Sequence, residues 1–215
     1  MRPRVRVKIC GVTSPEVARA AAAAGADAVG LVFAESRRRV TVAQAEQIAA
    51  VLPPFVAAVG VFVDAPVEEV LTVAHGIPLD AVQLHGEETP QEVAALRAQG
   101  LRVVKAVRVG HRLDTEALER YRGASAVLLD TCVTGAAGGT GRPFDWSLAR
   151  GLSERVPVVL SGGLTPENVA EALEVVRPYA VDVSSGVETD GRKDPEKIRA
   201  FIEAVRRWEC RMALR

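Results

Sequence analysis

Residues 156–176, VPVVLSGGLTPENVAEALEVV, contain one strand, one turn and one helix, and they decide the fold class. The run 156–160 is apolar without alternation, which is typical of a strand buried on both faces of a parallel sheet. Thr-Pro-Glu at 165–167 predicts a helix start, because Thr caps free N–H groups and Pro suits the first turn. Helical spacing continues through Val169, Ala172, Leu173 and Val176.

The same unit recurs along the whole chain. Similar apolar runs lie at 5–9, 28–33, 57–63, 81–84, 103–107, 126–129, 156–160 and 180–184. Helix starts with proline recur at 14–16, 65–69, 89–92, 165–167 and 194–196, and a second helical stripe joins Ile198, Phe201, Ile202 and Val205. Eight alternating strands and helices predict an α/β fold, a closed (β/α)8 TIM barrel, as a single domain over 1–215. A doubly wound open sheet is the alternative.

Composition narrows the class of protein. Of the 215 residues, 48% are hydrophobic and 25% charged, and 27 basic residues balance 27 acidic ones. A zero net charge predicts no nucleic-acid or membrane partner. Three scattered cysteines form neither a disulfide framework nor a zinc motif, so we expect a reducing, cytoplasmic location. The three histidines show no metal-ligand pattern, so we expect no metal.

Chemistry in such a barrel belongs at the carboxyl ends of the strands. Cys10 and Asp130 stand at two of these ends. A thiol with a lowered pKa can act as a base, and a carboxyl with a raised pKa can act as an acid. Cys10 could instead be a packing residue and Asp130 a loop cap. Lys8, two residues before Cys10, shares its face of the strand and is the nearest candidate cation.

The last two strands end in small residues that suit a phosphate. Gly162 and Gly163 follow one strand, and Ser185 and Gly186 follow the next. Glycine lets backbone N–H groups approach an anion, and barrels commonly bind phosphate at these two strands. The alternative is a pair of tight turns. We therefore expect a phosphorylated small molecule as ligand, and a mobile loop over 130–146 that closes on it.

In combination, these stretches resemble the phosphoribosylanthranilate isomerase family of tryptophan biosynthesis. The matching pieces include VKICGVT (7–13), SRRRV (36–40), VQLHG (82–86), GGTG (138–141), LSGGLTPENV (160–169) and DVSSGVE (182–188), in the family's order. The resemblance implies the Amadori rearrangement of N-(5-phosphoribosyl)anthranilate to 1-(2-carboxyphenylamino)-1-deoxyribulose 5-phosphate. This chemistry needs no cofactor.

The resemblance also assigns site residues. It makes Cys10 the general base and Asp130 the general acid, and it maps the arginine that binds the anthranilate carboxylate to Arg38. His85 and Gly139 lie in matching motifs as further pocket residues, without an assigned role. The family occurs as monomers and homodimers.

Two departures from the family pattern stand out. Arg37 replaces a proline, which leaves three consecutive arginines, so it is less direct to say which of them binds the anthranilate carboxylate. Ser161 replaces an alanine and could add a phosphate contact.

Two other functions are compatible with parts of the pattern. The isomerase of histidine biosynthesis performs the same rearrangement on a substrate with two phosphates, but it has a carboxylate where Cys10 stands. A non-catalytic binding barrel would need neither Cys10 nor Asp130.

Overall fold

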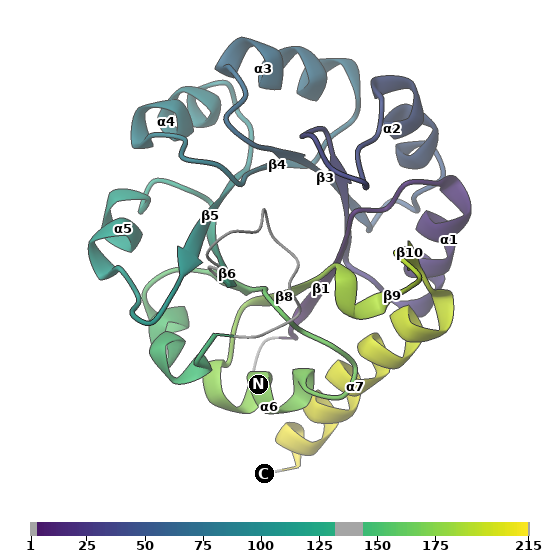
Figure 1. Cartoon of the computed structure of the whole chain (residues 1–215), viewed down its shortest axis with the longest axis vertical. Coiled ribbons are helices and arrows are strands. Elements are labelled where there is room, and N and C mark those ends of the chain that lie inside the picture. Colours follow the sequence, from purple (N-terminus) through teal and green to yellow (C-terminus); the bar gives the residue numbers. More distant parts are fainter. Residues whose placement is uncertain (1–3, 132–143, 215) are drawn as a thin grey trace.

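Eight parallel strands close into a barrel in sequence order, with the helices in a ring around it (Figure 1). The computed structural model describes residues 4–131 and 144–214. The strands are β1 (Arg6–Cys10), β2 (Ala28–Val32), β3 (Ala57–Phe62), β4 (Ala81–Leu84), β5 (Val103–Val109), β6 (Ala126–Thr131), β7 (Val158–Leu160) and β8 (Ala180–Val183). Because β8 pairs with β1, the predicted barrel is confirmed and the open sheet is excluded.

The described residues form seven α-helices, three of which begin where the sequence predicts. They are α1 (Pro15–Ala24), α2 (Val42–Ala49), α3 (Val67–Gly76), α4 (Pro90–Ala98), α5 (Thr115–Arg120), α6 (Val169–Val176) and α7 (Pro195–Ala213). The 3-10 turns η1 (Trp146–Ala149) and η2 (Leu152–Glu154) precede β7. After β8 come η3 (Ser185–Val187) and a ribbon of β9 (Glu188–Thr189) and β10 (Arg192–Lys193). Ser14, Thr89 and Asp194 cap α1, α4 and α7 as expected.

Two helix starts differ from the prediction. Pro66 precedes α3 as its N-cap residue, without a side-chain cap. The first turn expected at Thr165 does not yet belong to α6, which begins at Val169. There, Asn168 accepts the N–H of Thr165 and donates to the carbonyl of Gly163, each at 2.8 Å. The Thr165 hydroxyl accepts the N–H of Glu167 at 3.3 Å and the Thr165 carbonyl accepts the N–H of Val169 at 3.1 Å. Residues 165–168 thus form a capped turn before the regular helix, and Asn168 fastens this turn to the glycine pair.

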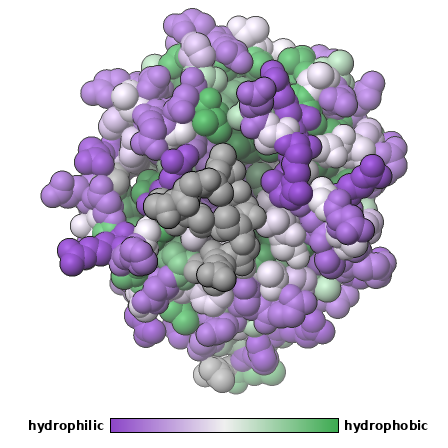
Figure 2. Space-filling model, in the orientation of Figure 1, coloured by the Kyte–Doolittle hydropathy of each residue, from purple (hydrophilic) through white to green (hydrophobic). Residues whose placement is uncertain are grey.

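The core has an outer and an inner part. The outer part packs the helices on the barrel. It contains the side chains of both predicted helical stripes, including Phe201, which is fully buried. The inner part is a separate cluster of small and medium side chains from neighbouring strands: Ala106, Ala126, Leu128, Val159 and Ala180. On the face that Figure 2 shows, hydrophilic side chains form most of the rim and hydrophobic surface is broken into small patches.

Candidate active site

The predicted site residues gather at one end of the barrel. Cys10 is the last residue of β1, and Asp130 is the penultimate residue of β6. The glycine pair follows β7, and Ser185 begins η3, separated by one residue from the end of β8. Since all eight strands are parallel, their carboxyl ends face the same side, and these groups from distant parts of the sequence surround one opening.

Cys10 shares a buried compartment with Lys8 and Asp182. The Lys8 ammonium lies 2.8 Å from Oδ1 of Asp182, and both side chains are almost fully covered. Gly30, the register partner of Cys10 on β2, leaves room for them. A Cβ at Gly30 would lie 2.8 Å from the Cys10 sulfur and 3.1 Å from the Lys8 nitrogen. The thiol and the ammonium therefore point into the same space, as the spacing of Lys8 and Cys10 predicts.

The protonation of this compartment differs from the sequence-based expectation. Burial raises the pKa of the Cys10 thiol, the Lys8 charge opposes this, and the Asp182 carboxylate adds to it; the pKa ends above its usual value rather than below. Burial alone would lower the pKa of Lys8, but Asp182 and Cys10 outweigh it and raise that pKa. Lys8 is thus a permanent cation beside the thiol, and the Asp182 carboxylate opposes its effect on the thiol.

Asp130 has a histidine partner. Its Oδ2 lies 3.1 Å from Nε2 of His85, and its Oδ1 accepts the N–H of Thr131 at 2.9 Å. On the other side of the His85 ring, Nδ1 lies 2.8 Å from the side-chain amide Nε2 of Gln83. With that amide donating, Nδ1 is the acceptor and Nε2 carries the proton that His85 donates to Asp130. His85, which the sequence leaves without a role, therefore contacts the candidate acid.

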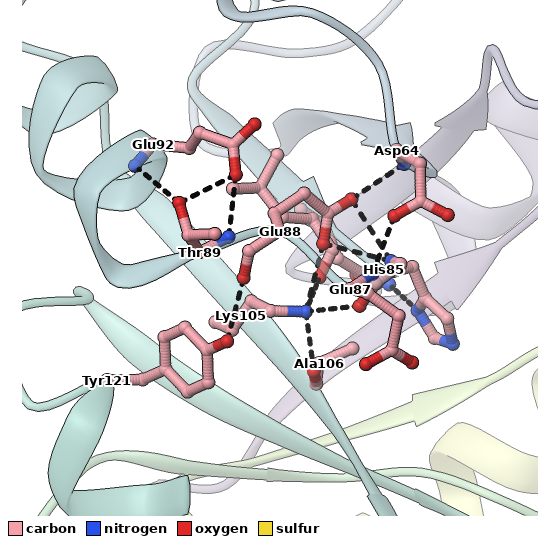
Figure 3. A network of polar contacts seen from close by, with 12 residues as sticks. Asp64, His85, Glu87, Glu88, Thr89, Glu92, Lys105, Ala106 and Tyr121 are labelled. Carbon is pink, nitrogen blue, oxygen red and sulfur yellow. Dashed lines mark hydrogen bonds and ion pairs between the residues drawn. The ribbon is translucent and has the colours of Figure 1, made fainter.

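A buried ion pair holds the loop that carries His85 (Figure 3). Lys105 of β5 lies 2.9 Å from the Glu88 carboxylate and donates to the carbonyl of Gly86 at 2.7 Å. The same carboxylate accepts the N–H groups of Asp64 and Gly86 at 3.0 Å each. The loop after β4 is thereby fastened to both neighbouring strands, and the backbone next to His85 is held in place.

Among the three arginines, Arg38 is the one that turns inward. Its side chain is 19% exposed, against 57% for Arg37, and Arg39 is also exposed. The Arg38 chain lies over Gly11, where a Cβ would collide with it. Its Nε and Nη2 contact the two oxygens of Glu188 at 2.7 and 2.9 Å. The arginine that is predicted to bind the carboxylate thus lies over the turn of Cys10 and Gly11, called the Cys10 turn below. The edge of its guanidinium that carries Nε and Nη2 is already paired with Glu188.

Glu188 also binds Lys193, and the two share one buried pocket. Burial would raise the pKa of Glu188, but hydrogen bonds and charge from Arg38 and Lys193 hold it below its usual value. Burial lowers the pKa of Lys193, which Glu188 only partly offsets. Lys193 is also a second cation that favours the thiolate form of Cys10.

The two small-residue turns lie together. Gly162 and Gly163 have φ of 84° and 71°, a conformation that favours glycine. Within residues 4–131 and 144–214, no hydrogen-bond acceptor is found for either N–H of this pair. A Cβ at Gly186 would collide with the carbonyl oxygen of Leu164, so the turn after β8 packs directly on the turn after β7. Ser161 faces Asp182, 3.4 Å away, instead of joining these turns.

Several site residues escaped sequence reasoning. They are Gly30, Gln83, Asp182, Glu188 and Lys193; three of them, Gln83, Asp182 and Glu188, lie within stretches that resemble the family, but the sequence assigns them no role. A charge within a buried strand, as at Asp182, is the signal that could have pointed to one of them. Gly139 lies outside the described residues, as does Cys132, the second of the three cysteines. Among the described residues, no group of three acidic, His or Cys side chains could hold a metal ion, and no helix is long and apolar enough to span a membrane.

Fold and site together define a class. A (β/α)8 barrel with a thiol, a carboxyl, an inward arginine and two glycine turns at the carboxyl ends of its strands has the arrangement of a barrel enzyme that moves protons on a small anionic molecule.

Comparison with known proteins identifies the member of this class. The family model of N-(5'-phosphoribosyl)anthranilate isomerase matches residues 7–204. The isomerase of that name from Pseudomonas fluorescens is 54% identical over 205 residues, 94% of this chain and 98% of the relative. The crystal structure of phosphoribosyl anthranilate isomerase from Thermotoga maritima has a TM-score of 0.87 and 47% identity, covering 94% of this chain and 98% of that one.

Another solved structure, of a phosphoribosyl anthranilate isomerase in complex with reduced 1-(o-carboxyphenylamino)-1-deoxyribulose 5-phosphate, has a TM-score of 0.81 and 46% identity, covering 94% of this chain and 98% of that one. The Thermotoga maritima enzyme is described as dimeric. The chain belongs to the N-(5'-phosphoribosyl)anthranilate isomerase family, and it is an isomerase of the intramolecular oxidoreductase kind.

Proposed function

We propose that Asp130 and Cys10 divide the proton transfers of this isomerisation, a step of tryptophan biosynthesis. Asp130 protonates the ribose ring oxygen, the C1–O bond breaks, and the nitrogen lone pair forms an iminium ion. Cys10, as thiolate, removes the C2 proton, and the electrons of that bond form an enolamine that tautomerises to the ketone. The observation that carries this assignment is that both groups stand at carboxyl ends of barrel strands.

Each partner suits its task. When Asp130 has given up its proton, the Nε2–H of His85 stabilises the carboxylate that remains. When Cys10 is ionised, Lys8 and Lys193 stabilise the thiolate. Because both steps are proton transfers, no metal or redox cofactor has to take part.

The rest of the site holds the two ends of the substrate. The free edge of Arg38 binds the anthranilate carboxylate, for which a planar guanidinium is well suited. The backbone N–H groups of Gly162, Gly163, Ser185 and Gly186 bind the 5-phosphate. The bound analogue in the solved structure of the relative has both a carboxylate and a phosphate, which supports this division.

The test is turnover of freshly generated phosphoribosylanthranilate, followed by the loss of its fluorescence. Cys10→Ala and Asp130→Asn should each lower kcat by roughly 10²-fold or more. The matched control is Cys210→Ala, because Cys210 is an exposed thiol on α7 and should be dispensable. Wild-type rates in Cys10→Ala would remove Cys10 from the mechanism, and failure of the wild-type protein to exceed spontaneous decay would overturn the whole assignment.

For the molecule as a whole, we propose one barrel domain over 1–215 that works in the cytoplasm as a monomer or a homodimer. Phe55, in the loop before β3, is 97% exposed, and a second copy of the chain is one partner that would cover it. Light scattering of the wild-type protein and of Phe55→Ser distinguishes the two states. A dimer that persists in Phe55→Ser would exclude this residue from the interface.

A further inference from the structure

One carboxylate collects three cations beside the Cys10 turn. Glu188 lies 2.6 Å from Nη2 of Arg37, 2.7 Å from Nε of Arg38 and 2.9 Å from Nη2 of Arg38, and it also binds Lys193. Its side chain is only 5% exposed. Three positive charges around one negative charge leave a local excess of positive charge, so an anion from outside is attracted here even with Glu188 in place.

The way Glu188 holds Arg38 leaves a second edge open. A guanidinium has five N–H donors in a rigid fork, and Glu188 takes the edge formed by Nε and Nη2. The edge formed by Nη1 and the second Nη2 hydrogen makes no hydrogen bond within residues 4–131 and 144–214. A second carboxylate can therefore bind bidentately without displacing Glu188.

The cluster is fixed to the backbone next to the proposed base. Lys193 donates to the carbonyl and the hydroxyl of Ser184, at 3.1 and 3.3 Å. The Ser184 hydroxyl donates in turn to the carbonyl of Cys10 at 3.1 Å. Since the Arg38 chain also lies over Gly11, the orientation of the guanidinium is fixed relative to the Cys10 turn.

We propose that Glu188 is a positioning residue that aims the open edge of Arg38 at the anthranilate carboxylate and thereby places the substrate over Cys10. This proposal rests on the proposed function of Arg38. Glu188 does not touch the substrate; it acts by limiting the rotation of the guanidinium. The opposite role, in which Glu188 competes with the substrate for Arg38, requires the substrate to use the Nε edge.

The experiment compares two substrates that differ by one carboxylate. They are the phosphoribosylamines made from anthranilate and from aniline, with ketose formation followed by chromatography. In Glu188→Gln, we expect KM for the anthranilate substrate to rise by about tenfold or more with kcat changed less than KM. Efficiency toward the aniline substrate should fall less than efficiency toward the anthranilate substrate, because only the anthranilate substrate has a carboxylate for Arg38 to bind. Glu188→Asp keeps the charge, but its side chain is too short for both hydrogen bonds to Arg38. Its KM for the anthranilate substrate should therefore lie between the values of the wild type and of Glu188→Gln.

The matched control is Glu203→Gln, an exposed glutamate on α7 that should change neither substrate. Equal losses for both substrates in Glu188→Gln would show a merely structural role and overturn the proposal. A lowered KM for the anthranilate substrate would also overturn it and establish competition. Should Glu188→Gln fold poorly, Glu188→Asp with both substrates decides by the same comparison.

Arg38→Ala separates this inference from the proposed function. If Arg38→Ala loses its preference for the anthranilate substrate while Glu188→Gln keeps it, only the positioning role of Glu188 is wrong. If Arg38→Ala keeps the preference, Arg38 is not the carboxylate-binding residue, and the role proposed for Arg38 fails together with the inference.

Discussion

Removing the Lys105 ammonium should destabilise the barrel by several kcal/mol. Lys105 and Glu88 are each 2% exposed and lie 2.9 Å apart (Figure 3). Lys105→Met fills similar volume but leaves the Glu88 carboxylate buried without its cation. Breaking a buried pair from one side costs about 3–5 kcal/mol. In a protein of this size each kcal/mol lowers Tm by about 2–4 °C, so Tm should fall by about 6–20 °C.

The double variant Lys105→Met with Glu88→Gln tests the reason for this loss. It removes both charges, so its unfolding free energy should be higher than the sum of the two single losses predicts, with a coupling of about 0.5–3 kcal/mol. Urea titrations at neutral pH, followed by circular dichroism, measure all four proteins of the cycle.

Arg199→Met is the control, because Arg199 pairs with Glu196 on the surface, where the side chains are 56% and 75% exposed. It should cost less than about 1 kcal/mol. The reasoning is refuted if Lys105→Met costs no more than Arg199→Met, or if the cycle is additive. Because Lys105 also holds Gly86 of the His85 loop, kcat of the folded Lys105→Met protein should fall as well.

Three further outcomes follow from the site. Because the pKa of Cys10 is raised and the base must be ionised, kcat/KM should increase with pH across the neutral and mildly alkaline range. Fluorescence decay in a buffer series measures this profile, and a profile already flat at neutral pH would contradict the prediction. Gly30→Ala should lower kcat by about tenfold or more, since its Cβ would crowd the Cys10 sulfur, whereas Gly76→Ala, with open space around its Cβ, should leave kcat unchanged. Glu188 has a folded pKa below its unfolded value, so its stabilisation is present above the unfolded pKa and disappears as the pH falls through the folded one. Urea midpoints in acid should therefore drop more for the wild-type protein than for Glu188→Gln, and parallel curves would exclude this contribution.

The sequence predicts the parts of this molecule that local rules control. Apolar runs locate the eight strands, and Ser14, Thr89 and Asp194 mark helix starts, because burial and capping depend on neighbouring residues. The strand-end rule then places Cys10 and Asp130 at one opening. The regular helix α6 begins later than predicted because the segment after Thr165 first makes a turn, which Asn168 ties to the carbonyl of Gly163.

Pairings between distant residues were beyond local rules. Lys8 and Asp182 are 174 positions apart, and Arg38 and Glu188 are 150 apart. No pattern in either stretch says which charge meets which, since that depends on barrel closure. The raised pKa of Cys10 was missed for the same reason, because burial and the Asp182 charge outweigh the nearby ammonium.

The joining of β1 to β8 has a consequence for the order of events during synthesis. Cys10 and Arg38 leave the ribosome early, whereas Asp182, Glu188 and Lys193 leave it late. The surroundings of the thiol therefore stay incomplete until most of the chain has been translated and its first and last strands have met. Such distant pairings form slowly. The return of enzymatic activity during refolding should thus lag behind the recovery of helix signal, and it would report the moment at which the ring of strands closes.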